Sequence, residues 1–128
     1  RIHELCALKF PDIDLKQGLI KVVAKTTKTK SARYLPISVK TCKLLKQLMD
    51  ISKDGEGEYV FQSTYGGAIK PANISLSLNR IREKAGIKKV CTPYTLRHTF
   101  ATNSVRSGMD LFTLQRIMGH QTLLTTRK

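Results

Sequence analysis

Apolar residues recur along the chain at two spacings, and these divide it into helical and extended segments. Spacings of three and four residues predict helices over 1–8, 38–49, 71–85 and 94–107, with a short helix after Asp110. The β-branched segments 19–23 and 32–37 predict two strands joined by a basic turn, and therefore a β-hairpin, while 59–61 predicts a further short strand. The predicted fold class is mainly α with a small antiparallel β-sheet (α+β).

Turn and capping residues place the ends of these elements. Ser38 and Asp110 are favourable helix N-caps, and Thr92-Pro93 begins the 94–107 helix. Pro36 belongs near a sheet edge or a strand end because it has no N–H to donate, and 12–18 has the composition of a turn. The predicted inward positions of the helices are Val39, Cys42, Leu45, Leu48, Met49, Ile74, Leu78, Ile81, Ala85, Leu111, Leu114 and Ile117.

The length and the first residues of the chain indicate how many domains it contains. With 128 residues it has room for one core of ordinary size and is too short for two full domains. No run reaches the about 18 apolar residues that a membrane-spanning helix needs. A helical pattern is already under way at Arg1, so we expect residues 1–128 to be a single domain cut from a longer protein.

Positive charge is concentrated rather than dispersed. The formal net charge is +14, and residues 15–49 hold nine basic and no acidic residues. An ordinary solvated surface intersperses both signs, so this stretch predicts a polyanionic partner, most often nucleic acid. An anionic membrane is the main alternative, and it is less favoured because the stretch is not one amphipathic helix.

The cysteines and histidines do not form a recognisable metal or disulfide pattern. Cys6, Cys42 and Cys91 are far apart and lack paired spacing, which predicts reduced thiols in a cytoplasmic protein. His3, His98 and His120 lack the spacing of zinc ligands, so we expect no metal.

Three motifs stand in order along the chain: Arg1-Ile-His-Glu-Leu, Leu96-Arg97-His98-Thr-Phe-Ala-Thr and Gly119-His120. Together they resemble motifs of the tyrosine recombinases, also called phage-type integrases. The first five residues, Arg1-Ile-His-Glu-Leu, are similar to the family's first arginine motif. Leu96-Arg97-His98-Thr-Phe-Ala-Thr matches the second arginine motif, and Gly119-His120 matches the third, 23 residues after Arg97. In order and with matching gaps, these motifs imply the catalytic-domain fold of that family.

The predicted hairpin also resembles the family. Residues 27–36 are similar to the family's hairpin, which carries an active lysine eight residues before a proline. That register selects Lys28 over Lys25 and Lys30. Lys25, Lys30 and Arg33 are then candidates for contacts with DNA, as is His98, although a structural role within the helix is the more ordinary interpretation of His98.

The resemblance implies transesterification of a DNA phosphodiester through a 3′-phosphotyrosyl intermediate, with no metal, ATP or other cofactor. Arg1 and Arg97 would stabilise charge on the non-bridging oxygens, because guanidiniums stay charged and donate in a planar fork. Lys28 would protonate the leaving 5′-oxygen. His120 would donate a hydrogen bond to the phosphate or assist proton transfer.

Two positions depart from the family pattern. Tyr94 occupies a position, three residues before Arg97, where the family usually has His or Lys. A phenol donates a hydrogen bond but is a poor base near neutral pH, so Tyr94 is a weaker catalytic candidate. The family's nucleophilic tyrosine would fall at position 129, and Tyr34, Tyr59, Tyr65 and Tyr94 all lie elsewhere, so we expect the nucleophile to be absent from residues 1–128.

The partners and location follow from the same resemblance. We expect double-stranded DNA at recombination sites as partner, a tetramer on DNA for the full-length protein and a monomer for this fragment. We also expect a cytoplasmic protein, associated with the nucleoid when bound to DNA, with a role in mobile-element integration or excision. The fragment alone is expected to be inactive, lacking the family's N-terminal DNA-binding domain as well as the tyrosine segment.

Other interpretations of these residues remain open from sequence alone. The helices around Gly108 loosely imitate a helix-turn-helix, which would make the chain a non-catalytic DNA-binding module. A type IB topoisomerase would share the chemistry. Individually, Arg1 could be a solvated terminal residue, Lys28 a phosphate contact, Arg97 the partner of a carboxylate such as Glu4, and His120 a charge at a helix C-terminus.

Overall fold

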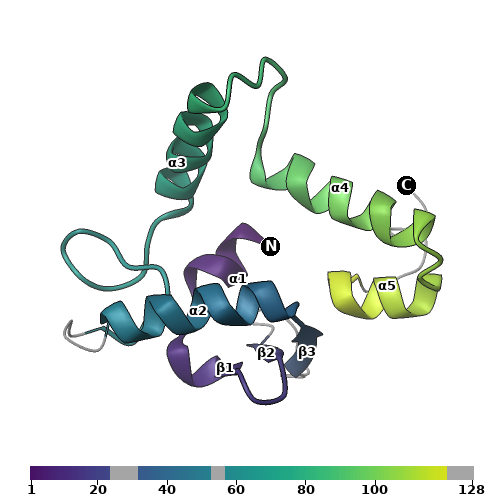
Figure 1. Ribbon diagram of the computed structural model, residues 1–128, viewed down its shortest axis with the longest axis horizontal. Helices are drawn as coiled ribbons and strands as arrows, with labels where there is room; N and C mark the ends of the chain where they lie inside the picture. Colours follow the sequence, from purple (N-terminus) through teal and green to yellow (C-terminus); the bar gives the residue numbers. More distant parts are fainter. Residues whose placement is uncertain (24–31, 53–56, 121–128) are drawn as a thin grey trace. The chain divides into compact units, whose positions relative to one another are not determined.

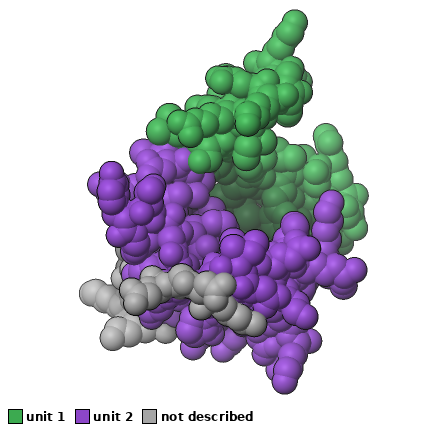
Figure 2. Space-filling view, turned by 60° about the vertical axis from the view of Figure 1, so that its left-hand side comes forward, with its two compact units in different colours: residues 1, 75–128 green, residues 2–74 purple. Residues whose placement is uncertain are grey.

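The structure, a computed structural model, describes residues 1–23, 32–52 and 57–120. It divides into two compact units: residues 2–74 form one, and Arg1 with residues 75–128 forms the other (Figure 2). The described elements are five α-helices, one 3-10 helix and a three-stranded sheet (Figure 1). The predicted class, mainly α with a small antiparallel sheet, is confirmed. Within the described residues, no helix is both long and apolar enough to cross a lipid bilayer.

The sheet of the 2–74 unit is antiparallel, in the order β1-β2-β3. β2 (Leu19–Val23) and β3 (Ala32–Pro36) pair along their full lengths, which confirms the predicted hairpin. Pro36 ends the edge strand β3, as its missing N–H requires. β1 (Ile13–Asp14) follows the 3-10 helix η1 (Phe10–Asp12) and pairs with β2, so the prediction of a turn over all of 12–18 was wrong. A two-residue strand is too short to show a period.

Two helices complete this unit around one apolar core. α1 (Ile2–Cys6) opens the chain, and α2 (Val39–Ser52) follows Ser38, whose Oγ accepts the N–H of Thr41 at 3.2 Å. The core centres on Leu8, Leu45 and Val60, with seven partly buried neighbours: Phe10, Ile13, Leu15, Ile20, Ile37, Leu48 and Phe61. Helical periodicity therefore identified the inward face of α2 correctly at Leu45 and Leu48.

The segment 59–61 is not the strand that its composition predicted. Tyr59 makes only an isolated bridge with Lys9. Two backbone bonds flank that bridge, from the N–H of Phe10 to the carbonyl of Glu58 and from the N–H of Val60 to the carbonyl of Leu8, at 3.1 and 2.9 Å. A second isolated bridge joins Gln62 to Ala68, so single bridges and the burial of Val60, rather than a ladder, hold the segment.

The remaining helices are α3 (Pro71–Lys84), α4 (Pro93–Arg106) and α5 (Leu111–Met118). The boundary between the units falls within α3, after its fourth residue. α4 and α5 pack against each other, and Leu114 and Met118 of α5 are buried (Figure 1). Three residues predicted to point inward are exposed instead: Val39 at the start of α2, Ile81 on α3, and Ala85 just after α3. Two of them lie at or beyond a helix end, where fewer neighbours cover a side chain.

Candidate active site

The first turn of α4 is fixed by its own sequence. Thr92 is the N-cap: its Oγ1 accepts the N–H of Thr95 at 3.2 Å, and Thr95 Oγ1 accepts the N–H of Thr92 at 2.8 Å. This reciprocal capping box satisfies two backbone donors that a helix start leaves unpaired. Pro93 occupies the first helical position, where its fixed φ suits the helix. Arg97 therefore lies just after a first turn whose backbone is fixed by this cap.

The C-terminal end of α5 is a Schellman motif, which fixes the backbone of Gly119 and His120. Gly119 has a left-handed conformation, with φ 66°, that favours glycine. Its N–H donates to the carbonyl of Arg116 at 3.1 Å, and the N–H of His120 donates to the carbonyl of Gln115 at 3.0 Å. These two bonds satisfy carbonyls that the helix would leave unpaired, and they turn the chain sharply at Gly119.

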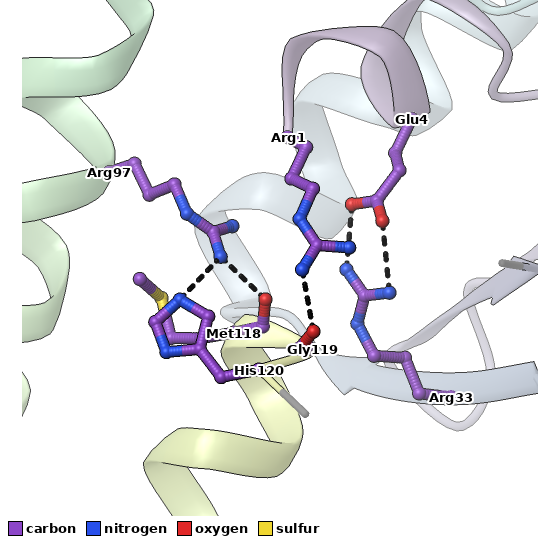
Figure 3. A network of polar contacts seen from close by, with 7 residues as sticks. All are labelled: Arg1, Glu4, Arg33, Arg97, Met118, Gly119 and His120. Atoms are coloured by element: carbon purple, nitrogen blue, oxygen red, sulfur yellow. Dashed lines mark hydrogen bonds and ion pairs between the residues drawn. The ribbon is translucent and has the colours of Figure 1, made fainter. Parts of the chain in front are cut away.

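Arg97 and His120 meet at this helix end (Figure 3). Arg97 Nη2 donates to the carbonyl of Met118 at 2.5 Å and lies 3.1 Å from His120 Nε2. A guanidinium at a helix C-terminus is favoured because the last carbonyls carry partial negative charge. The motif spacing of 23 residues thus corresponds to direct contact between the two side chains.

Arg1 reaches the same helix end. Its Nη2 donates to the carbonyl of Gly119 at 2.6 Å, one residue beyond the carbonyl that Arg97 contacts (Figure 3). Two guanidiniums and one imidazole are therefore gathered around three consecutive residues, 118–120. Three groups that can donate to oxygen at one point form a site suited to a phosphate anion.

The surroundings of His120 favour the neutral form of its imidazole. Partial burial lowers the pKa of His120, and the positive charges of Arg97 and Arg1 lower it further. A guanidinium has no acceptor, so in the contact with Arg97 the Nε2 of His120 accepts and Nδ1 carries the proton. The neutral imidazole can therefore take up a proton when an anion approaches.

Glu4 and Arg33 form a bidentate pair within the 2–74 unit. Arg33 Nη1 donates to Oε1 of Glu4 at 3.0 Å, and Nη2 donates to Oε2 at 2.7 Å (Figure 3). Burial alone would raise the pKa of Glu4, yet the bonds and charge of Arg33 help to lower it to about 2. The pair fixes α1 to β3. The expected DNA contact of Arg33 stays a prediction.

Tyr94 and His98 lie together on an exposed part of α4. Their rings are 6.3 Å apart with an interplanar angle of 71°, and His98 Nδ1 lies 3.3 Å from Thr102 Oγ1. Tyr94 is 72% exposed, and its hydroxyl makes no hydrogen bond to any residue that the structure describes. As expected for consecutive helical residues, His98 and Arg97 have different contacts. The catalytic role of Tyr94 also stays a prediction.

Lys25, Lys28 and Lys30 lie outside the described residues, so the predicted general acid and its two basic neighbours have no structural account. In the described ranges, no cluster of three or more His, Cys, Asp or Glu residues could hold a metal ion.

Sequence reasoning missed one residue at this site. Gln115 Nε2 donates to the carbonyl of His120 at 3.1 Å, while the carbonyl of Gln115 accepts the N–H of His120. The sequence held a signal for the backbone bond of residue 115, but none for the bond of its side chain. A helix that ends at Gly119 in a Schellman motif pairs the N–H of the next residue with the carbonyl five residues earlier, which is that of Gln115.

The chain resembles known proteins along its full length. The profile described as phage integrase family matches residues 1–128. Tyrosine recombinase XerC of Xanthomonas axonopodis pv. citri (strain 306) is 32% identical over 127 residues, which cover 99% of this chain and 41% of that protein.

Solved structures show the same fold. The crystal structure of XerA recombinase superposes with a TM-score of 0.89 at 34% identity, covering 99% of this chain and 46% of that one. XerH site-specific recombinase bound to difH substrate, in a pre-cleavage complex, gives a TM-score of 0.86 at 26% identity, covering 99% of this chain and 38% of that one. The chain thus spans less than half the length of these relatives. It belongs to the phage integrase family.

Proposed function

We propose that this chain is the catalytic portion of a site-specific DNA recombinase, the activity named in its relatives XerC and XerH. The observation that carries the proposal is the convergence of Arg1, Arg97 and His120 on the C-terminal end of α5. These groups can surround one phosphate of a DNA strand. The net charge of +14 supports the polyanionic partner.

The proposed reaction conserves the energy of the phosphodiester bond. A tyrosine hydroxyl attacks phosphorus, the bond from phosphorus to the 5′-oxygen breaks, and a 3′-phosphotyrosyl link forms. The departing 5′-oxygen takes a proton and becomes a free hydroxyl, which can later reverse the step on the same or a partner strand. Covalent catalysis of this kind divides one difficult transfer into two easier ones.

Three of the roles are supported by the contacts of Arg1, Arg97 and His120, and that of Lys28 is supported by the motif alone. Arg1 and Arg97 bear fixed positive charge and would stabilise the charge that builds on the two non-bridging oxygens. His120 accepts at Nε2 in the free state, so it can receive the proton of the attacking hydroxyl or, once protonated, donate to a phosphate oxygen. We assign the proton for the 5′-oxygen to Lys28, by its register in the hairpin motif.

The nucleophile and the assembly belong to the same proposal. The family pattern puts the attacking tyrosine at position 129. We propose that a polypeptide with a tyrosine there acts on double-stranded DNA as a tetramer, and that residues 1–128 alone bind DNA as a monomer without cutting it. A binding module of the helix-turn-helix kind would have no use for two arginines and a histidine gathered at the end of α5.

A nicked suicide substrate tests the proposal. A version of the protein with a tyrosine at position 129 should form a covalent protein–DNA adduct that survives denaturing electrophoresis. Arg97→Ala should reduce the rate of adduct formation by about 100-fold or more while leaving most DNA binding intact. Arg106→Ala is the matched control, because it removes an exposed arginine of the same helix outside the site. Absence of an adduct with the unmutated protein on cognate DNA would contradict the catalytic proposal.

A further inference from the structure

The side chain of Gln115 contacts the backbone of His120 from within α5. The side-chain Nε2 of Gln115 donates to the carbonyl of His120 at 3.1 Å, and the backbone carbonyl of Gln115 accepts the N–H of His120 at 3.0 Å. The N–H and the carbonyl of His120 are therefore both bonded to a single residue. Gln115 is partly buried, so water competes less for the hydrogen bond that its side-chain amide donates.

The position of the His120 backbone determines where its imidazole lies. The Schellman bonds fix the chain up to the N–H of His120, but they place no restraint on its carbonyl. A group that holds this carbonyl also restrains φ of His120, because rotation about φ moves the carbonyl and the Cβ together. The amide of Gln115 supplies this restraint, and the imidazole remains 3.1 Å from Arg97 Nη2.

We propose that Gln115 is a positioning residue for His120, which holds both the N–H and the carbonyl of His120 and so directs the Nε2 of His120 to the point where Arg1 and Arg97 converge. Gln115 itself contacts neither guanidinium. The catalytic consequence rests on the proposed function of the site, while the structural consequence does not.

The structural part can be tested on the 128-residue chain by NMR of the His120 ring nitrogens. The unmutated protein should show the tautomer with the proton on Nδ1. Gln115→Met keeps the length and helix preference of the side chain and removes the donor, so it should mix the two tautomers. Arg1 and Arg97 are the charged groups near the ring, and neither is changed. Gln47→Met, on an exposed face of α2, is the matched control.

A second pair of variants separates this positioning role from a general effect on folding. Gln115→Asn retains the amide but is one methylene shorter, so it should behave like Gln115→Met. Gln115→Lys restores a donor of sufficient reach and should recover the single tautomer. Circular dichroism verifies that α5 is intact in each. Ring signals of His120 that are the same in Gln115→Met, Gln115→Asn and the unmutated chain would overturn the proposal.

The catalytic part uses the version with a tyrosine at position 129. Gln115→Met should slow adduct formation by about tenfold to a hundredfold, because a small displacement of a reacting group has an effect of that order, while DNA binding stays within about twofold. Gln115→Lys should recover part of the rate. An unmutated protein that forms no adduct counts against the proposed function alone. A normal adduct rate in Gln115→Met counts against the positioning role.

Discussion

The Glu4–Arg33 pair should make a measurable contribution to the stability of the 2–74 unit. Both side chains are 17% exposed, and two parallel bonds of 3.0 and 2.7 Å join them. The fall in the pKa of Glu4 from 4.5 to about 2 sets an upper bound of about 3 kcal/mol for the stabilisation at neutral pH. Solvent screening weakens the interaction, and other positive charge also lowers this pKa. The stabilisation due to Arg33 itself is therefore about 1–2 kcal/mol.

A double-mutant cycle measures that contribution directly. Glu4→Gln and Arg33→Gln should each lower the free energy of unfolding by about 2–3 kcal/mol, because each leaves a partly buried partner unpaired. The double variant should lose less than the sum of the two, and the difference should be about 1–2 kcal/mol. Urea denaturation at pH 7, followed by far-UV circular dichroism, gives all four values. The exposed Lys9–Glu58 pair in the same unit is the control and should show a smaller coupling.

The stabilisation that Glu4 contributes should depend on pH in a defined direction. The pKa of Glu4 is lower in the folded chain than in the unfolded chain, so between about pH 2 and pH 4.5 the unfolded chain binds more protons. The stabilisation is therefore complete above about pH 4.5 and is lost as the pH falls towards 2. The stability difference between the unmutated chain and Glu4→Gln should shrink over that range. A coupling energy near zero at pH 7 would show that the pair contributes no stabilisation. A stability difference between the unmutated chain and Glu4→Gln that is the same at pH 7 and pH 3 would show that the carboxylate charge of Glu4 is not its source.

Three further predictions concern charge and the end of α5. Binding of the 128-residue chain to duplex DNA should weaken by about a hundredfold or more between 50 and 500 mM salt in fluorescence anisotropy, and an affinity independent of salt would contradict the electrostatic interpretation. Gly119→Ala should lower the free energy of unfolding by about 1 kcal/mol, because φ is 66° there. Gly108→Ala, at a φ of 84°, is its control: both should destabilise in urea, but only Gly119→Ala should shift the ring signals of His120. The pKa of His120 is lowered by folding, so the unfolded chain binds a proton more readily and stability should fall as the pH drops below about 6.5. His120→Ala should lack this loss in the same titration, and an identical pH profile would exclude His120 as its source.

The sequence predicted the regular elements best where local chemistry alone decides them. The strand at 19–23 followed from its β-branched residues, and the strand at 32–36 followed from its mixed polar and apolar residues with a proline at the end. α4 followed from Thr92-Pro93. Prediction failed at Ile13–Asp14, because a two-residue strand is too short to show a period, and at Tyr59, because its single bridge depends on Lys9, which is distant in sequence. Periodicity also could not foresee that Ile81 would lie 63% exposed on α3.

At the candidate site, too, some contacts could be predicted from the sequence and others could not. The spacing of Arg97 and His120 within known motifs was enough to predict that they act together, and the structure places them 3.1 Å apart. The pairing of Arg33 with Glu4 could not be read from the sequence, because 29 residues separate them and several other basic residues compete for the carboxylate. The amide of Gln115 was missed because a glutamine in a helix has no chemical signature of its own.

The central claim is that Arg97 stabilises negative charge on a non-bridging oxygen of the scissile phosphate. Replacement of that oxygen by a methyl group, as in a methylphosphonate, removes the charge and leaves the bond to be broken unchanged. The measurement is the rate of adduct formation by the version with a tyrosine at position 129 and by its Arg97→Ala variant, on suicide substrates with either linkage. We predict a ratio of about 100 or more on the phosphate and close to one on the methylphosphonate. The same large ratio on both substrates would contradict the claim.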